Sequence, residues 1–266
     1  MYFVLKKKSE ESIQVFCSDI KNYLPYKTRL HPKSIPLHYD SELASFLLTL
    51  DLNVTLHNCS NLGSLPNPPG FNITVPLKGS DGKTLAFLFA SPSVNIISFT
   101  GTFFFGQWLS DLDASQVPPR GIGTAHYTHT LVHSGFYKLY MSIQEKLHEA
   151  LKKYPSSTLF ITGHSLGGAL ANLCAYDLAS SFKNMIVYTF AAPRLGNLAF
   201  ASAYDNMISK SNSYRIFNTE DVVPDTPPPI LGNYIYEHVG VNVPFTDNLG
   251  SLTKNHINAY EKFYGI

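Results

Sequence analysis

The sequence predicts an α/β fold in which a mainly parallel sheet is covered by helices on both faces. From residue 71 onward, short apolar runs of strand length alternate with longer segments of helical periodicity. Strands separated by helices form parallel sheets, and both faces of such sheets need cover. The chain has 266 residues and is 44% hydrophobic, enough to bury one large core. We therefore expect a single domain over residues 1–266.

The predicted elements follow one another in a regular order. Residues 84–90 and 95–100 are expected to form strands, and the second is expected to be buried because it is nearly all apolar. Residues 135–154 have one apolar face with three-to-four spacing, which predicts a helix that ends before Pro155. The later predicted elements are the strand 158–162, the helix 166–182, the strands 185–191, 213–218 and 234–243, and the helix 255–264.

Residues 1–70 have the weakest pattern in the chain. Prolines are scattered through them, and a Pro/Asn/Gly cluster at 65–70 is typical of a loop. We assign no element here and expect the segment to pack on the sheet rather than to form a separate domain. At the start of the chain, the apolar residues 1–5 precede three lysines, which reverses the order in a secretory signal peptide. No signal peptide is predicted, and the cellular compartment is left open.

Charge and cysteine content exclude several classes of function. The chain has 20 Lys and Arg residues against 19 Asp and Glu residues, so no net field favours nucleic acid. No apolar run approaches the roughly 18 residues that a transmembrane helix needs. The three cysteines lack metal-ligand spacing, so no metal site is expected. Cys174 is expected to be a buried free thiol. For Cys17 and Cys59, the sequence leaves a disulfide and two free thiols as alternatives.

A pentapeptide from Gly163 to Gly167 matches the pattern Gly-x-Ser-x-Gly, with Ser165 at its centre. The motif is weak alone, but here the strand 158–162 leads into it and the helix 166–182 follows it. Such an abrupt turn crowds the backbone and requires small residues two positions before and after the serine. It also raises the hydroxyl to the carboxyl edge of the sheet and directs the helix N-terminus towards it. We therefore interpret Ser165 as a nucleophile.

A nucleophilic serine needs a base to take its proton and an acid to orient that base. In folds with this turn, the acid and then the histidine follow the serine along the chain. Three acids lie just past the predicted strand 213–218, namely Glu220, Asp221 and Asp225. Asp221 is preferred because Val-Val-Pro follows it and would anchor the loop. Of the two later histidines, His238 is expected to be a strand residue, so His256 is preferred as the base.

Several further blocks of sequence occur in a fixed order. They are Phe99-Thr100-Gly101-Thr102 with Trp108 and Asp111, then residues 132–136, 162–170, 189–197, 214–216 and 221–224, and finally Asn255-His256 through Tyr260. Together these blocks resemble the fungal-type triacylglycerol lipases, also called class 3 lipases, from about Ala86 to the C-terminus. The resemblance implies an α/β-hydrolase fold. It also implies a catalytic triad of Ser165, Asp221 and His256.

The resemblance further implies an oxyanion hole. Thr102 stands where the family has a Ser or Thr whose backbone N–H and hydroxyl contact the oxyanion, and Leu166 supplies the second backbone N–H. Asp111 matches the acid that holds this hydroxyl in position. The family usually has Arg where this chain has Thr100, and we expect that difference to affect local packing rather than chemistry.

An aromatic cluster follows the implied oxyanion hole and corresponds to the family's lid, namely Phe103, Phe104, Phe105 and Trp108. Burying an aromatic side chain stabilises a protein by about 1.5–3 kcal/mol relative to leaving it in water. We therefore expect these residues either to pack into the core, or to cover an acyl groove and contact a lipid interface transiently. The sequence favours a lipase that acts on acylglycerols without a metal or organic cofactor. A phospholipase A1, a short-chain or feruloyl esterase, an acyltransferase, and a non-catalytic binding protein are the alternatives.

Overall fold

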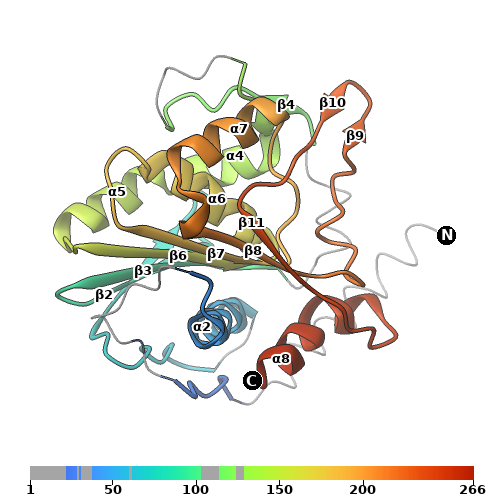
Figure 1. Cartoon of the computed structure of the whole chain (residues 1–266). Helices are drawn as coiled ribbons and strands as arrows, with labels where there is room; N and C mark the ends of the chain where they lie inside the picture. Colours follow the sequence, from blue (N-terminus) through green and yellow to red (C-terminus); the bar gives the residue numbers. More distant parts are fainter. Residues whose placement is uncertain (1–21, 29, 31–37, 60–61, 103–113, 124–128) are drawn as a thin grey trace.

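The structure is a computed structural model that describes residues 22–28, 30, 38–59, 62–102, 114–123 and 129–266. Its centre is a seven-stranded sheet with the strand order β1-β2-β3-β6-β7-β8-β11 (Figure 1). The antiparallel part consists of β1 (Ile73–Lys78), β2 (Thr84–Ala90) and β3 (Val94–Phe99). The parallel part continues from β3 through β6 (Thr158–His164), β7 (Met185–Phe190), β8 (Ser213–Asn218) and β11 (Val241–Phe245).

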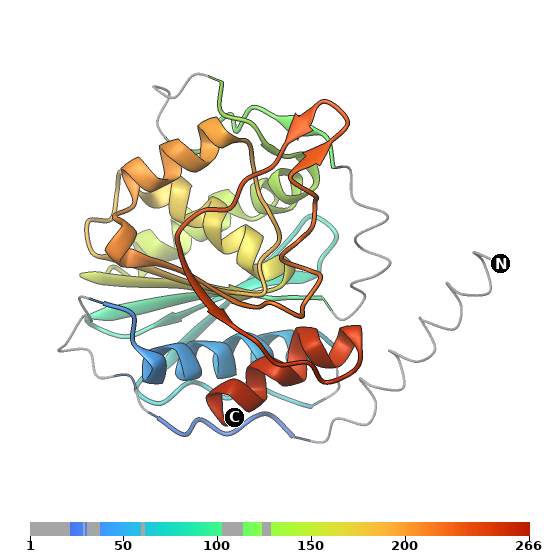
Figure 2. The same ribbon diagram turned by 45° about the vertical axis from the view of Figure 1, so that its right-hand side comes forward.

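Helices cover both faces of this sheet, which confirms the predicted fold class (Figures 1 and 2). One face carries α4 (Ser134–Met141), α5 (Gln144–Lys153), α6 (Leu166–Leu178) and α7 (Leu198–Met207). The other face carries α2 (Ser41–Cys59) and α8 (Ala259–Tyr264). Smaller elements are the strand pairs β4 (Gln116–Val117) with β5 (Val132–His133) and β9 (Ile230–Leu231) with β10 (Tyr234–Ile235), the 3₁₀ turn η1 (Lys210–Asn212) and the π-helical turn η2 (Lys254–Asn258).

The central strands divide the apolar residues between two cores. Successive side chains of a strand point to opposite faces, so Ile97 and Ile161 pack with the α4–α7 layer, whereas Ile96 and Phe160 pack with α2 and α8. Because both faces are covered, these strands are apolar at nearly every position. This explains the continuous apolar runs from which the strands were predicted.

Three predicted elements differ from the observed ones. The predicted helix 135–154 is two helices, with a break at residues 142–143 where Ser142 Oγ donates to the carbonyl of Leu139. The predicted strand 234–243 is also wrong, since β10 and β11 are separated by residues 236–240. Gly240 has a φ of 80° there, and a Cβ at this position would lie 2.8 Å from Ser213 Oγ. The predicted helix 255–264 begins with η2 before α8.

Helix α2 lies in the segment to which the sequence analysis assigned no element. Its 19 residues pack on the sheet against β3 and β6. The buried positions include four polar residues, Thr49, Asp51, Asn53 and Thr55. Because polar side chains occupy interior positions, the apolar periodicity that identifies most packed helices is missing here.

Other sequence predictions concern cysteines and membrane spans. Cys174 is a buried free thiol, as predicted. Cys17 and the side chain of Cys59 lie outside the described residues, so their pairing stays a prediction. Among the described helices, none has both the length and the apolar character needed to cross a membrane.

Candidate active site

Ser165 lies in the turn between β6 and α6, at the carboxyl edge of the sheet. Its φ of 60° is left-handed, a conformation that is uncommon for a residue with a Cβ and occurs often at functional sites. The backbone N–H of Ser165 donates to the carbonyl of Phe190 at 2.8 Å, which fixes the turn to β7. The side chain is only 1% exposed, and Ser165 Oγ has no hydrogen-bond partner among the described residues. The hydroxyl is thus held in place by the backbone rather than by its own contacts.

Glycines surround this turn for steric reasons. A Cβ on Gly163 would lie 2.2 Å from the carbonyl oxygen of Gly167, and a Cβ on Gly167 would lie 2.4 Å from that of Phe99. A Cβ on Gly168 would lie 2.7 Å from the Cβ of Ala192. All three separations are far below van der Waals contact, and the atoms met are backbone or, for Gly168, a Cβ that the backbone fixes in place. The crowding inferred from the Gly-x-Ser-x-Gly motif is therefore present.

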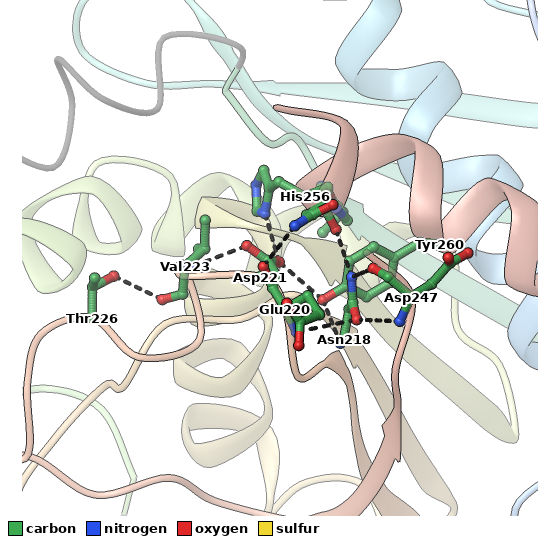
Figure 3. Close-up of polar contacts among 10 residues, drawn as sticks. Asn218, Glu220, Asp221, Val223, Thr226, Asp247, His256 and Tyr260 are labelled. Atoms are coloured by element: carbon green, nitrogen blue, oxygen red, sulfur yellow. Dashed lines mark hydrogen bonds and ion pairs between the residues drawn. The ribbon is translucent and has the colours of Figure 1, made fainter. Parts of the chain in front are cut away.

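Asp221 and His256 meet beside this turn, although 35 residues separate them in the sequence. His256 Nδ1 lies 2.8 Å from Asp221 Oδ2, and both side chains are buried. Asp221 also accepts hydrogen bonds from the Val223 N–H at 3.0 Å and from the Tyr260 hydroxyl at 3.0 Å (Figure 3). Because the carboxylate accepts, Nδ1 of a neutral His256 carries the proton and Nε2 is left with the lone pair.

Two asparagines join the loop of Asp221 to the segment of His256. Asn218 Nδ2 donates to the carbonyls of Asp247 at 2.8 Å and Asn255 at 3.2 Å. In return, Asn255 Nδ2 donates to the carbonyl of Glu220 at 3.0 Å. These bonds tie the end of β8 to η2 and to the segment before it. Figure 3 shows how closely the two parts of the chain lie.

Tyr260 connects the same two segments from α8. Its hydroxyl accepts from the Asn218 N–H at 3.0 Å and donates to Asp221. Burial, with the Asp221 charge beside it, raises the pKa of Tyr260 well above its ordinary value. The phenol therefore stays protonated and remains a donor to the carboxylate.

His164 connects the serine turn directly to His256. His164 Nε2 lies 2.8 Å from the carbonyl oxygen of His256, and the centroids of the two rings are 4.7 Å apart. Burial, together with the neighbouring His256, lowers the pKa of His164 well below its ordinary value. A neutral His164 that donates from Nε2 to this carbonyl satisfies both groups. Since Ser165 follows His164, this bond places the π-helical turn beside the serine, and π-helical turns often occur at functional sites.

The predicted oxyanion residues come from two neighbouring elements. Leu166 is the first residue of α6, so its backbone N–H belongs to the helix N-terminus. Thr102 lies just past β3, in a loop where a Cβ on Gly101 would lie only 3.0 Å from the carbonyl oxygen of His164. The same loop is bound to β2 through Thr100, whose N–H donates to the carbonyl of Leu85 at 3.0 Å.

Five residues predicted from the sequence lie outside the described part of the chain. They are Asp111 and the aromatic residues Phe103, Phe104, Phe105 and Trp108. Their roles stay predictions.

The alternative acids and the alternative histidine lie elsewhere. Glu220 binds the Asn248 side chain at 2.8 Å, and Asp225 pairs with Arg194 at 3.5 Å. His238 is not in a strand, contrary to prediction, because it lies in the connection between β10 and β11, which belong to different sheets. Its Nε2 lies 2.8 Å from the carbonyl oxygen of Pro224.

Among the described residues, no group of three or more His, Cys, Asp or Glu side chains is placed to hold a metal ion.

The fold and the serine turn define an α/β-hydrolase, and comparisons with known proteins identify the family. The family model described as Lipase (class 3) matches residues 96–231, about half of the sequence. The chain belongs to this class 3 lipase family, which confirms the resemblance inferred from the sequence blocks.

Individual relatives agree with this assignment. The chain is 37% identical to a lipase of Rhizomucor miehei over 164 residues, which cover 57% of this chain and 42% of that protein. It is 34% identical to the chloroplastic phospholipase A(1) DAD1 of Arabidopsis thaliana over 162 residues, which cover 54% and 36% of the two chains. It thus spans less than half the length of these two relatives.

Among solved structures, the chain is similar to a triacylglycerol lipase whose catalytic centre is described as a serine protease triad. The TM-score is 0.63 with 27% sequence identity, and the match covers 82% of this chain and 88% of the other.

His238 gives a prediction about stability. Burial, with Arg215 and Arg194 nearby, lowers the pKa of His238 from its usual 6.5 to about 3. Below about pH 6.5 the unfolded chain binds a proton that the folded chain does not, so this group stabilises the fold above that pH and loses its contribution as the pH falls towards 3. As the pH decreases below about 6.5, the free energy of unfolding of the wild type should therefore fall more steeply than that of His238→Gln, by up to ~1.4 kcal/mol per pH unit.

Urea unfolding between pH 4 and 7 measures this difference. His38→Gln, which removes an exposed histidine, is the control and should follow the wild-type curve. Parallel curves for the wild type and His238→Gln would contradict the prediction.

Proposed function

We propose that this chain is a serine carboxylic-ester hydrolase that acts on acylglycerols, with Ser165, Asp221 and His256 as its catalytic triad. The observation that carries the proposal is the buried 2.8 Å hydrogen bond between Asp221 and His256, tied by His164 to the strained turn of Ser165. Family membership supports it, and so does the similar triacylglycerol lipase that uses such a triad.

In the proposed reaction, His256 Nε2 takes the proton of Ser165 as the serine oxygen attacks the ester carbonyl carbon. The backbone N–H groups of Thr102 and Leu166 stabilise the resulting oxyanion. When the tetrahedral intermediate collapses, the bond to the alcohol breaks and His256 gives its proton to the departing oxygen. Water, activated by the same histidine, then hydrolyses the acyl-enzyme and releases the fatty acid. These steps require no metal or organic cofactor.

The buried carboxylate of Asp221 has two tasks in this mechanism. It keeps the proton of neutral His256 on Nδ1, so that Nε2 can act as the base, and it stabilises the imidazolium that forms. The Val223 N–H and the Tyr260 hydroxyl hold the carboxylate in one orientation. This support matters because a rotated carboxylate would no longer direct the imidazole towards the serine.

Exposed apolar side chains support a lipid substrate and contact with a lipid surface. Val222 follows Asp221 directly and is 42% exposed, and Leu252 precedes His256 by four residues and is 65% exposed. The β9–β10 pair, which follows the loop of Asp221, adds the exposed residues Ile230, Leu231 and Ile235. We expect these side chains, in the loops that carry or follow the candidate acid and base, to make the contact with a lipid surface.

The reaction class and the substrate class can be tested together. p-Nitrophenyl esters of two to eighteen carbons are assayed with and without an emulsified interface, using the wild type, Ser165→Ala and the control Ser209→Ala. Wild-type activity should rise with chain length and with the interface, and Ser165→Ala should lower it by about 10³-fold or more. Ser209 is exposed on the connection before β8, so its variant should retain full activity.

Other outcomes of this assay favour the alternatives. Activity confined to short soluble esters would indicate an esterase, and a preference for phospholipids in a parallel assay would indicate a phospholipase A1, the activity named for the Arabidopsis relative. Full activity of Ser165→Ala would contradict the proposed mechanism.

The lipid-surface contact gives a separate prediction. Val222→Ser and Leu252→Ser should each lower hydrolysis of emulsified triacylglycerol several-fold, because each removes apolar area that would enter the lipid, at about 25 cal/mol per Å². Hydrolysis of a soluble short-chain ester should stay unchanged. Val241→Ser is the matched control, since Val241 is 37% exposed but lies at the amino end of β11, the opposite edge of the sheet. Equal losses on soluble and emulsified substrates would contradict the role of this surface.

A further inference from the structure

Helix α2 carries buried polar side chains under the two strands that lead to the candidate site. It crosses the sheet on the face opposite α6 (Figure 2) and packs against β3 and β6. β3 ends just before Thr102, and β6 ends just before Ser165. Asp51 and Thr55 of this helix are almost fully buried. Buried polar groups are costly unless they make specific hydrogen bonds, so their partners indicate what they do.

Asp51 joins the two strands to each other. Its carboxylate accepts from Ser98 Oγ at 2.6 Å and from Thr162 Oγ1 at 2.7 Å. Ser98 of β3 and Thr162 of β6 are direct neighbours in the parallel register. One buried side chain of α2 therefore fixes both strands a few residues before the loop of Thr102 and the turn of Ser165.

Thr55, one helical turn further along α2, reaches the loop itself. Its hydroxyl donates to the carbonyl of Asp51 at 2.7 Å and accepts from the backbone N–H of Gly101 at 2.8 Å. A hydroxyl has a single proton, so donation to the helix carbonyl leaves a lone pair for Gly101. The bond thus has one direction, from the loop backbone to the helix side chain.

Gly101 is the residue whose backbone rotation sets the direction of the Thr102 N–H. Glycine lacks a Cβ and rotates more freely than any other residue. A larger residue would be crowded here, because a Cβ would lie 3.0 Å from the carbonyl oxygen of His164 and 3.4 Å from Thr55 Oγ1. Gly101 has no side chain to hold its backbone, and its N–H is bound by the Thr55 hydroxyl.

We propose that Thr55 is a positioning residue for the oxyanion hole: it anchors the backbone of Gly101 and thereby aims the N–H of Thr102 at the developing oxyanion. The proposal rests on the proposed function. An oxyanion donor is effective only when it lies about 2.7–3.1 Å from the oxyanion, and productive site geometry tolerates displacements of only about 0.5 Å. Helix α2, which lies outside the segment that matches the family model, would then be part of the catalytic support.

The test compares variants of two threonines on the same helix. Thr55→Val removes the hydroxyl at nearly constant volume, and Thr55→Ser keeps it. Thr49→Val is the matched control, because Thr49 is equally buried and its hydroxyl donates only one turn back, to the carbonyl of Ser45 at 2.8 Å. Each protein is assayed for kcat and KM on a soluble short-chain p-nitrophenyl ester. A trifluoromethyl ketone, which adds reversibly to an active-site serine, gives an inhibition constant for the tetrahedral oxyanion.

Thr55→Val should lower kcat by about 10- to 100-fold and change KM by less than about threefold, because the loss falls on the transition state. Inhibition by the trifluoromethyl ketone should weaken by a similar factor. Thr55→Ser should restore most of both losses, and Thr49→Val should stay within about twofold of the wild type. If Thr55→Val does not fold, Thr55→Ala supplies a second variant without the hydroxyl and with the same expected loss.

Two results would overturn the inference. In the first, the variants at Thr55 lose stability but keep the kcat and inhibition constant of Thr49→Val, which would assign Thr55 a structural role only. In the second, Thr55→Ser loses as much kcat as Thr55→Val. These results differ from a failure of the proposed function, in which the wild type hydrolyses no ester or Ser165→Ala stays active, and both proposals are then wrong.

Discussion

The backbone turn at Ser165 is the constraint on which the surrounding structure depends. With φ at 60°, the chain reverses from β6 into α6 so tightly that Gly163 and Gly167 have no room for a Cβ. Gly167 packs directly on the carbonyl of Phe99, so the end of β3 must lie against the start of α6. The strained conformation costs on the order of 1–3 kcal/mol and persists only because the neighbouring strands fix it from both sides. One steric requirement therefore brings the serine, the helix N-terminus and the loop of Thr102 to the same place.

The rest of the site is assembled by polar contacts rather than by backbone sterics. Asp221 lies in the loop after β8 and His256 lies in η2, and their bond is supported by Asn218, Asn255 and Tyr260, which join the two segments. His164 then attaches this assembly to the serine turn. These groups are buried, and removing any one would leave a hydrogen-bond partner unpaired at a cost of about 1–3 kcal/mol. The site is thus coupled to the stability of the fold.

The sequence predicted the sheet and the serine turn because both follow from local patterns. Apolar runs such as that in β6 reveal buried strands, and the glycines around Ser165 are required by the turn itself. Asp221 and His256 could be selected by their order and by the loops around them, and the two side chains lie together as expected. The resemblance to class 3 lipases supplied Thr102 and Leu166 as the candidate oxyanion residues.

Other features could not be predicted because their signals depend on distant contacts. The polar residues Asp51 and Thr55 obscured the periodicity of α2, and only the folded sheet explains why they are buried. The break between α4 and α5 and the turn before β11 depend on single residues such as Ser142 and Gly240. Asn218, Asn255 and Tyr260 are ordinary in the sequence, and their role appears only when the loop after β8 meets η2 and α8.

The most direct test of the account is the site of covalent labelling by a fluorophosphonate, which reacts with serines activated by a neighbouring base. The labelled protein is digested and the modified peptide is identified by mass spectrometry, for the wild type, His256→Gln and the control His238→Gln. If Ser165 is the nucleophile and His256 its base, there should be one label per chain on Ser165, which His256→Gln abolishes and His238→Gln retains. Labelling of another residue, or labelling of Ser165 that survives His256→Gln, would contradict it.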